Sequence, residues 1–562
     1  MSIPDDAEPQ DGRPVAARSW LLPILFLAGV TVFAVYYLGL LHGRPVLWTD
    51  SYEYALAGRA LAEGRGLTTD SATVMEFAML YRGTLPVPYF FHDVGNSLLH
   101  ALTYRLFGSS DAVIPMASGL CFALLAPATF VLGRRLFGAR VGALATVLVL
   151  TNAQLLAHST TGLSETPTAL GLTVLLGLLA PSATFGALKR VTIGAAFGAL
   201  VVLRSNAFVF LPWICLFLWT LPVAEGSGGP RPPALARSRV LALFLAGFCL
   251  VWGPAAIRTQ IGLGRPLATV ASYYIPLFHT SAIAGSVKDV YSSPGLDVDP
   301  RAFFAEHPGE LASKALWQLG RLIPELLRGG GLWVKNDWVE AVLLFLFVLG
   351  VVAPPPRETV AQTRARWLLL AMLGTSLVVG LAVFLRWRHL YAFLPVVLVY
   401  DAEVIMRVFG KGDEGRHALG PGAIARLAFV VVVLAALGWG RLAGDVGGEF
   451  AEGMRANNDY YQALGEFLRQ KTRRGAVVLV RCPEPLSELR ALGWYGRRQL
   501  VEHSPYTEVA VLAHKGPSRV FFLVTSGPGQ AHPVDDGIPG FVSVARWNSG
   551  SGDHAALFAA PR

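Results

Sequence analysis

The sequence has 562 residues, of which 53% are hydrophobic and 15% are charged. Soluble domains carry about 25% charged residues, so this composition excludes an ordinary soluble protein. The formal net charge of +9 does not indicate a nucleic-acid partner, because arginines gathered in the cytoplasmic loops of a membrane protein produce the same excess. Of the four cysteines, Cys121, Cys215 and Cys249 lie inside apolar runs, which indicates neither a disulfide framework nor a cysteine metal site.

The chain begins with a polar segment and a membrane anchor. Residues 1–19 are acidic and contain prolines, which predicts a disordered cytoplasmic segment. The apolar run from Trp20 to Leu41 is long enough to cross a bilayer, which takes about 20 residues. No small-residue cleavage site follows this run, so we interpret it as an anchor and not as a signal peptide.

Further apolar runs predict a polytopic α-helical membrane protein with about eleven spans within residues 20–443. After the first, the runs lie at 112–133, 141–157, 166–180, 191–203, 206–221, 240–257, 339–353, 367–385, 389–405 and 427–443.

Clusters of positive residues alternate with these runs. They precede the first span and follow the second, fourth, sixth, eighth and tenth. Because arginine and lysine gather in cytoplasmic loops, every cluster falls on one side if the N-terminus is cytoplasmic. An odd number of spans then places residues 444–562, and the long loops 43–111 and 259–337, on the extracytoplasmic side of the inner (plasma) membrane.

Several reactive side chains fall on this outer side. Ionisable groups at a membrane bundle mark functional sites by default, and two carboxylates with several arginines suit a reaction that holds a lipid phosphate and deprotonates a hydroxyl or an amine. As alternatives, Arg204 caps a helix end and Arg386 and Arg388 reach lipid headgroups. The candidates are Asp50, Glu165, Arg204, Arg258, Arg386, Arg388 and His389.

The two long outer loops contain further candidates. In the first loop, Glu53 follows Asp50, residues 55–61 predict a short amphipathic helix along the water–lipid boundary, and residues 97–108 predict a second interfacial helix that stops at Gly108. His92 and Asp93 are interpreted as a proton-transfer pair, as groups near a metal, or simply as polar loop. In the second loop, helices near 300–307 and 308–327 predict a mobile element over the site.

The tail, residues 444–562, changes character and predicts a small extracytoplasmic α/β domain. A helix is expected over 460–471, strands over 476–480, 520–524 and 541–545, and a helix near 485–493. No phosphate-binding glycine pattern stands out, and both structural support and acceptor binding remain open as its role.

These residues resemble those of a known family, the membrane-embedded GT-C glycosyltransferases, and in particular the protein-mannosyltransferase-like and aminoarabinose-transferase-like group. The resemblance runs from about Trp20 to Ala443, and it rests on the order and spacing of several short patterns. They are Trp48-Thr49-Asp50-Ser51-Tyr52-Glu53-Tyr54, Leu106-Phe107-Gly108 with Gly133-Arg134-Arg135-Leu136-Phe137-Gly138, Ser164-Glu165, Trp252-Gly253-Pro254-Ala255-Ala256-Ile257-Arg258, and Arg388-His389-Leu390 with Pro395.

The resemblance implies transfer of a sugar from a polyprenyl-phosphate donor to a lipid, glycan or protein acceptor, with inversion at the anomeric carbon. Asp50 would be the general base, Arg258 and Arg388 would hold the donor phosphate, and Glu165 would support the acceptor or the sugar. Ser51 stands where many members have a second acidic residue, so neither a metal nor another cofactor is indicated.

Two other classes remain as alternatives. A transporter or flippase of polyprenyl lipids or glycolipids requires polar or broken helices near the bilayer midplane, whereas the ionisable residues here cluster at one face. A non-catalytic assembly subunit keeps the same fold without activity.

Overall fold

The computed structural model describes residues 20–180, 186–221, 233–266, 268–283, 299–327, 338–353, 358–383, 387–409, 449–483, 485–515, 519–526, 538–549 and 554–560, with isolated positions between them. The predicted disordered segment 1–19 and most of the last predicted span, 427–443, lie outside the described residues.

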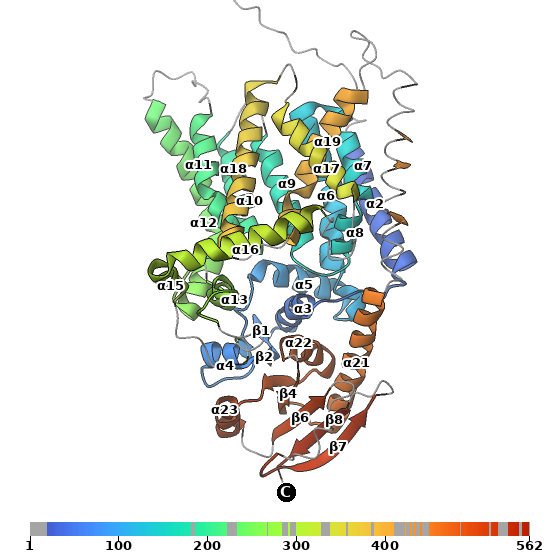
Figure 1. Ribbon diagram of the computed structural model, residues 1–562, viewed down its shortest axis with the longest axis vertical. Coiled ribbons are helices and arrows are strands. Elements are labelled where there is room, and N and C mark those ends of the chain that lie inside the picture. Colours follow the sequence, from blue (N-terminus) through green and yellow to red (C-terminus); the bar gives the residue numbers. More distant parts are fainter. Residues whose placement is uncertain are drawn as a thin grey trace, which may run out of the picture.

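A bundle of helices forms one end of the molecule (Figure 1). Its described elements are α2 (Leu21–Ala34) with η1 (Val35–Leu40), η2 (Asp111–Val113) with α6 (Met116–Phe137), α7 (Ala139–Thr151), α8 (Ala153–Ser159), α9 (Glu165–Leu179), α10 (Ala187–Leu203), η3 (Ser205–Phe210) with α11 (Leu211–Thr220), α12 (Pro233–Leu263), α17 (Trp338–Val352), α18 (Val360–Ala382), and η5 (Trp387–Phe393) with α19 (Leu394–Phe409).

In the described part of the chain, four helical segments are long and apolar enough to cross a membrane, namely Leu21–Leu40, Asp111–Phe137, Arg237–Leu263 and Gln362–Ala382. The pair α7 and α8 makes a fifth if it is counted as one span bent by 60°. The predicted number of about eleven spans is therefore not confirmed within the described residues, partly because some runs are interrupted. Asn152, for example, ends α7 and caps α8 by accepting a hydrogen bond from the N–H of Leu155 at 2.9 Å.

Glycines allow the bundle helices to approach closely. A Cβ at Gly194 of α10 would lie 1.9 Å from the carbonyl oxygen of Phe244 in α12, and a Cβ at Gly247 of α12 would lie 2.1 Å from that of Val191. Small residues at such crossings let two helix backbones pack directly, which is the usual means of association within a membrane.

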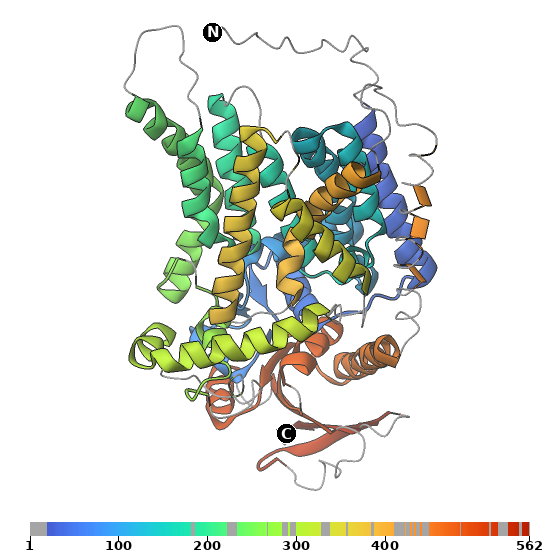
Figure 2. The same cartoon turned by 45° about the horizontal axis from the view of Figure 1, so that its top comes forward.

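The two long loops cover the end of the bundle. The first contains α3 (Thr49–Ala62), β1 (Thr68–Thr69), β2 (Ser71–Ala72), α4 (Val74–Leu80), β3 (Val87–Pro88) and α5 (Val94–Phe107). The second contains α13 (Val270–Tyr274), η4 (Ile275–Leu277), α15 (Pro300–Glu306) and α16 (Pro308–Leu327). The helices predicted over 300–307 and 308–327 are confirmed, and both views show α16 lying across the bundle end that faces the sheet (Figures 1 and 2).

The C-terminal part contains a six-stranded mixed sheet in the order β2-β5-β4-β6-β8-β7. The described helices and strands of the C-terminal part are α21 (Glu449–Lys471), β4 (Val477–Arg481), α22 (Pro485–Gly496), β5 (Gln499–Glu502), α23 (Pro505–Lys515), β6 (Val520–Ser526), β7 (Val542–Asn548) and β8 (His554–Ala559). The sequence analysis did not predict β5, α23 or β8.

The sheet also includes a strand from the first loop. Strand β2 pairs in parallel with β5, with Ser71 opposite Leu500 and Ala72 opposite Val501. The first loop and the C-terminal segment therefore fold as one unit, a long-range pairing that no local sequence pattern indicates.

Helix α3 lies inside this unit. Its side chains from Ser51 to Ala60 are buried, and it packs between α5 and α22. A helix over the predicted residues 55–61 is therefore confirmed, but it is buried and is not an amphipathic surface helix. Gly58 permits the contact with α5, because a Cβ there would lie 2.6 Å from the Cβ of His100.

Candidate active site at the end of the helical bundle

Two carboxylates project from the first turn of α3. The helix begins after Trp48, whose extended backbone N–H donates to Ser51 Oγ at 3.0 Å. Residues three apart lie on the same face of a helix, so Asp50 and Glu53 point in the same direction. Glu53 is fully buried, whereas the Asp50 side chain is 28% exposed.

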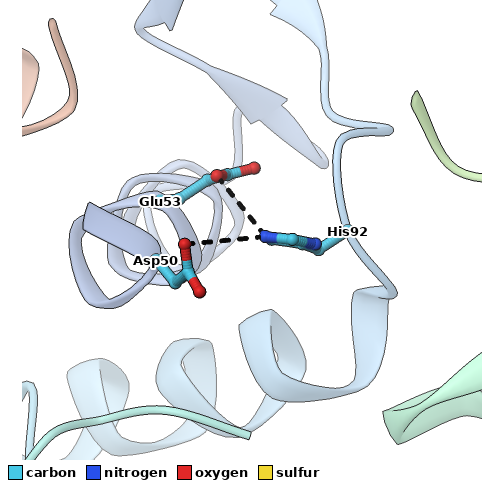
Figure 3. Close-up of side chains that lie close together, drawn as sticks. All are labelled: Asp50, Glu53 and His92. Carbon is cyan, nitrogen blue, oxygen red and sulfur yellow. Dashed lines mark ion pairs between the residues drawn. The ribbon is translucent and has the colours of Figure 1, made fainter. Parts of the chain in front are cut away.

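His92 faces both carboxylates from the side, with one ring nitrogen directed at them (Figure 3). Its Nε2 atom is 3.9 Å from Asp50 Oδ1 and 3.8 Å from Glu53 Oε2. The rings of Phe91 and Tyr54 flank the imidazole, with centroid distances of 4.9 and 5.3 Å. These contacts hold the ring in place with one nitrogen directed at both acids.

Burial and mutual attraction set the charges of this group. Burial by itself lowers the pKa of His92, but the charges of Glu53 and Asp50 outweigh it and raise that pKa to about 9. Burial raises the pKa of Glu53 to about 7, against the opposing attraction of Arg490 and His92. At neutral pH, therefore, His92 carries a proton that faces two acidic groups.

Asp93, the next residue, is bound by another segment of the chain. Its Oδ2 atom accepts hydrogen bonds from the backbone N–H and the Oγ of Ser205, at 2.9 and 3.1 Å. Burial raises the pKa of this carboxyl group, and the bonds from Ser205 oppose that rise. Asp93 thus ties the first loop to the start of η3.

A cavity of about 290 Å³ opens beside Asp50. Six of the residues proposed from the sequence line it, namely Asp50, His92, Asp93, Glu165, Arg204 and His389. The bundle supplies an apolar wall that includes Leu172, Leu200, Val379 and Phe393. The cavity therefore joins a polar end at α3 to apolar surface between the bundle helices, a combination that suits a polar headgroup carried on a lipid.

Glu165 and Arg204 stand at helix ends that face the cavity. Glu165 is the first residue of α9 and is 4% exposed. Arg204 ends α10, and its Nη1 is buried without a hydrogen-bond partner among the described residues. A guanidinium with an unused donor beside a cavity is well suited to bind a phosphate oxygen.

Arg258 contacts the first loop beside the main cavity. Its Nη2 donates to the carbonyl oxygens of Tyr89 and Leu67, and its guanidinium stacks over the ring of Phe90 at 4.0 Å. It lines a separate pocket of about 30 Å³ and not the main cavity. In this conformation Nη2 of Arg258 holds the first loop, while its Nη1 is buried without a hydrogen-bond partner among the described residues.

The other two arginines cannot be placed. Arg386 lies outside the described residues, as does the side chain of Arg388, although the backbone of Arg388 belongs to η5.

The sequence analysis missed two charged residues next to Glu53. Arg490 of α22 is fully buried and pairs with Glu76 of α4, and its Nε atom lies 3.8 Å from Glu53 Oε2. The position of Arg490 within an otherwise apolar helical pattern was the only signal in the sequence. That pattern could not identify its partners, which lie more than 400 positions earlier in the chain.

Asp50, Glu53 and His92 each offer a ligand atom, and these atoms lie within 4.8 Å of one another, so the group could hold a divalent cation. A cation there would compete with Arg490, whose Nε already lies 3.8 Å from Glu53 Oε2.

Comparison with solved structures defines the fold. ArnT from Cupriavidus metallidurans bound to undecaprenyl phosphate aligns with a TM-score of 0.60 and 13% identity, over 97% of this chain and 98% of that one. The Archaeoglobus fulgidus oligosaccharyltransferase in the apo form gives 0.55 and 13%, over 91% and 70%. Arabinofuranosyltransferase AftD from Mycobacteria gives 0.52 and 15%, over 97% of this chain and 40% of that one.

The chain therefore has the GT-C glycosyltransferase fold, which is a fold of multi-pass membrane proteins. No protein-family model matches the sequence, and none of the curated proteins compared with it matches.

Proposed function

We propose that this protein is an inverting glycosyltransferase of the plasma membrane, which moves a sugar from a polyprenyl-phosphate donor to an acceptor on the extracytoplasmic face. The observation that carries the proposal is the cavity, in which the carboxylates of Asp50 and Glu165 face the cations of Arg204 and His92 beside an apolar wall. The GT-C fold supports it, and one similar structure, ArnT, is described as bound to undecaprenyl phosphate.

In this reaction the acceptor oxygen or nitrogen attacks the anomeric carbon of the donor. The bond between that carbon and the phosphate oxygen breaks, and polyprenyl phosphate leaves with the electron pair. Asp50 takes the proton of the acceptor as general base. Arg204 stabilises the negative charge that develops on the phosphate, because a guanidinium placed in a site of low dielectric acts strongly on such charge.

Glu165 and His389 complete the polar lining, and we assign Glu165 to the hydroxyls of the sugar or the acceptor. His92 orients Asp50, since its imidazolium attracts the carboxylate from 3.9 Å. The arrangement of elements supports the proposed orientation, because α3 and the six-stranded sheet lie at the same end of the bundle (Figure 1).

Replacing Asp50 with asparagine tests the proposal. We expect D50N to lower turnover about 100-fold or more, because a positioned general base contributes that much. The assay measures release of undecaprenyl phosphate from a panel of undecaprenyl-phosphate monosaccharides, with membrane extract as acceptor.

The matched control is D459N, which removes an exposed carboxylate paired with Arg44 at 2.7 Å, away from the cavity. It should keep wild-type turnover. A D50N protein with wild-type turnover would refute the assignment of the base, and a wild-type protein inactive with every donor would refute the proposed activity.

A further inference from the structure

Arg490 is held rigidly by the first loop. Its Nη2 contacts both carboxylate oxygens of Glu76, at 2.6 and 2.7 Å, and its Nη1 donates to the carbonyl oxygen and the Oγ of Ser71, at 2.6 and 2.9 Å. The side chain is fully buried, and its guanidinium lies 5.3 Å from the ring of Phe91. Four short bonds therefore fix the plane and the direction of the guanidinium.

The remaining nitrogen of this guanidinium faces the candidate site. Nε lies 3.8 Å from Glu53 Oε2, and it has no hydrogen-bond partner among the described residues. Both oxygens of Glu53 are equally buried and also lack a hydrogen bond there. On its other side, Glu53 Oε2 is 3.8 Å from His92 Nε2. Glu53 is thus placed between two cations, one from the loop and one from α22.

We propose that Arg490 is a positioning residue of the active site, which holds Glu53 against His92 so that His92 remains directed at Asp50. The inference rests on the proposed function, because it assigns Arg490 a part in the same reaction. It makes the C-terminal segment a component of the active site, in place of a separate support or acceptor-binding domain.

A purely structural link between α22 and the loop does not account for this geometry. The bonds to Glu76 and Ser71 already join the two segments, and they leave both Nε and Glu53 buried without a hydrogen bond. Such unsatisfied polar groups cost free energy. Hydrogen bonds of a catalytic site are often long in the free enzyme and tighten when substrate binds, so the gap of 3.8 Å fits a site contact that closes during the reaction.

Other contacts of α22 support a shared site. Thr49 Oγ1, next to Asp50, is 3.1 Å from Ser487 Oγ, and Tyr52 Oη is 3.1 Å from Tyr495 Oη. Helix α22 therefore contacts the first turn of α3 on both sides of Asp50, and a displacement of α22 would move the general base.

The test compares R490M, R490K, E53Q and R490M/E53Q in the undecaprenyl-phosphate-sugar assay. Misplacement of a catalytic group lowers the reaction rate about 100-fold. We expect R490M to lower kcat by about 10-fold to 100-fold, with KM for the donor nearly unchanged. R490K should recover part of kcat because it retains the charge. R490M/E53Q should be no slower than E53Q alone, since Arg490 acts through Glu53.

The matched control is R498M, which removes another buried arginine of the same segment, one that donates to Thr472 and to backbone carbonyls and not to the loop. It should keep wild-type kcat. Because R490M leaves the charge of Glu76 buried and unpaired, R490M/E76M serves as a second variant if R490M does not fold.

Three results would overturn the inference: wild-type kcat in R490M or R490M/E76M, losses that multiply in R490M/E53Q, or equal losses in R498M. If the wild-type protein transfers no sugar, the proposed function fails instead. The melting temperatures of the same variants then test whether Arg490 and Glu53 interact. Additive shifts of the melting temperature in R490M and E53Q would exclude an interaction between the two residues.

Discussion

Replacing Glu53 with glutamine should move the alkaline limit of activity toward neutral pH. Glu53 lies 3.8 Å from His92, and its charge is the main force that raises the pKa of His92 to about 9. Two unit charges at this distance attract by about 4 kcal/mol at an effective dielectric constant of 20. Since 1.36 kcal/mol corresponds to one pH unit, the contact accounts for a rise of up to about 3 units.

The E53Q protein retains Asp50 beside the same nitrogen of His92, so the loss should be smaller than this limit. We expect the pKa of His92 to fall below its present value of about 9. The sign follows from the charge: removing a carboxylate destabilises the imidazolium, so His92 loses its proton at lower pH. Activity that requires the imidazolium then declines at a lower pH than the value of about 9 expected for the wild-type protein.

The pH dependence of kcat/KM for the undecaprenyl-phosphate-sugar donor measures this shift, because it reports the groups of the free enzyme. E63Q is a suitable control, since Glu63 is an exposed carboxylate at the end of the same helix, paired with Arg65. An alkaline limb that stays in place in E53Q, or moves equally in E63Q, would refute the proposed role of the Glu53–His92 pair.

Two further predictions concern ligands. Arg204→Met should weaken binding of undecaprenyl phosphate about tenfold or more, because a hydrogen bond to a charged group contributes about 1.5 to 3 kcal/mol. Equilibrium binding to the detergent-solubilised protein measures this change, with the exposed Arg105→Met as control. Equal affinities of the wild-type and Arg204→Met proteins would exclude Arg204 from the phosphate site. Treatment with EDTA should leave turnover unchanged, because His92 and Arg490 already balance the negative charge of the carboxylates. A loss of turnover that a divalent cation restores would show that Asp50, Glu53 and His92 hold a metal.

Some features of the site were accessible from local sequence. The alternation of positive clusters with apolar runs assigned Asp50, Glu165, Arg204 and His389 to one face, and the structure arranges these residues around one cavity. Helix α16 was predicted to the residue, because its apolar period and flanking proline are local signals.

Other features depend on contacts between distant segments. The sequence suggested that His92 and Asp93 act together, whereas the structure directs the first to Asp50 and Glu53 and the second to Ser205. Adjacent side chains in an extended segment point to opposite sides, and their roles are set by what packs there. The number of spans likewise stays a prediction, since apolar composition does not show where a helix breaks.

The stretch from Trp48 to Tyr54 illustrates the difference between what the local sequence predicts and what contacts between distant segments decide. Sequence determined that an acidic residue follows the first apolar span and that a helix covers residues 55–61, because apolar length and helical periodicity are local properties. Tertiary structure decided that this helix is buried, that Glu53 meets Arg490 of α22, and that β2 completes the C-terminal sheet. These pairings join residues more than 400 positions apart, and they arise from the burial of complementary surfaces, which no local periodicity records.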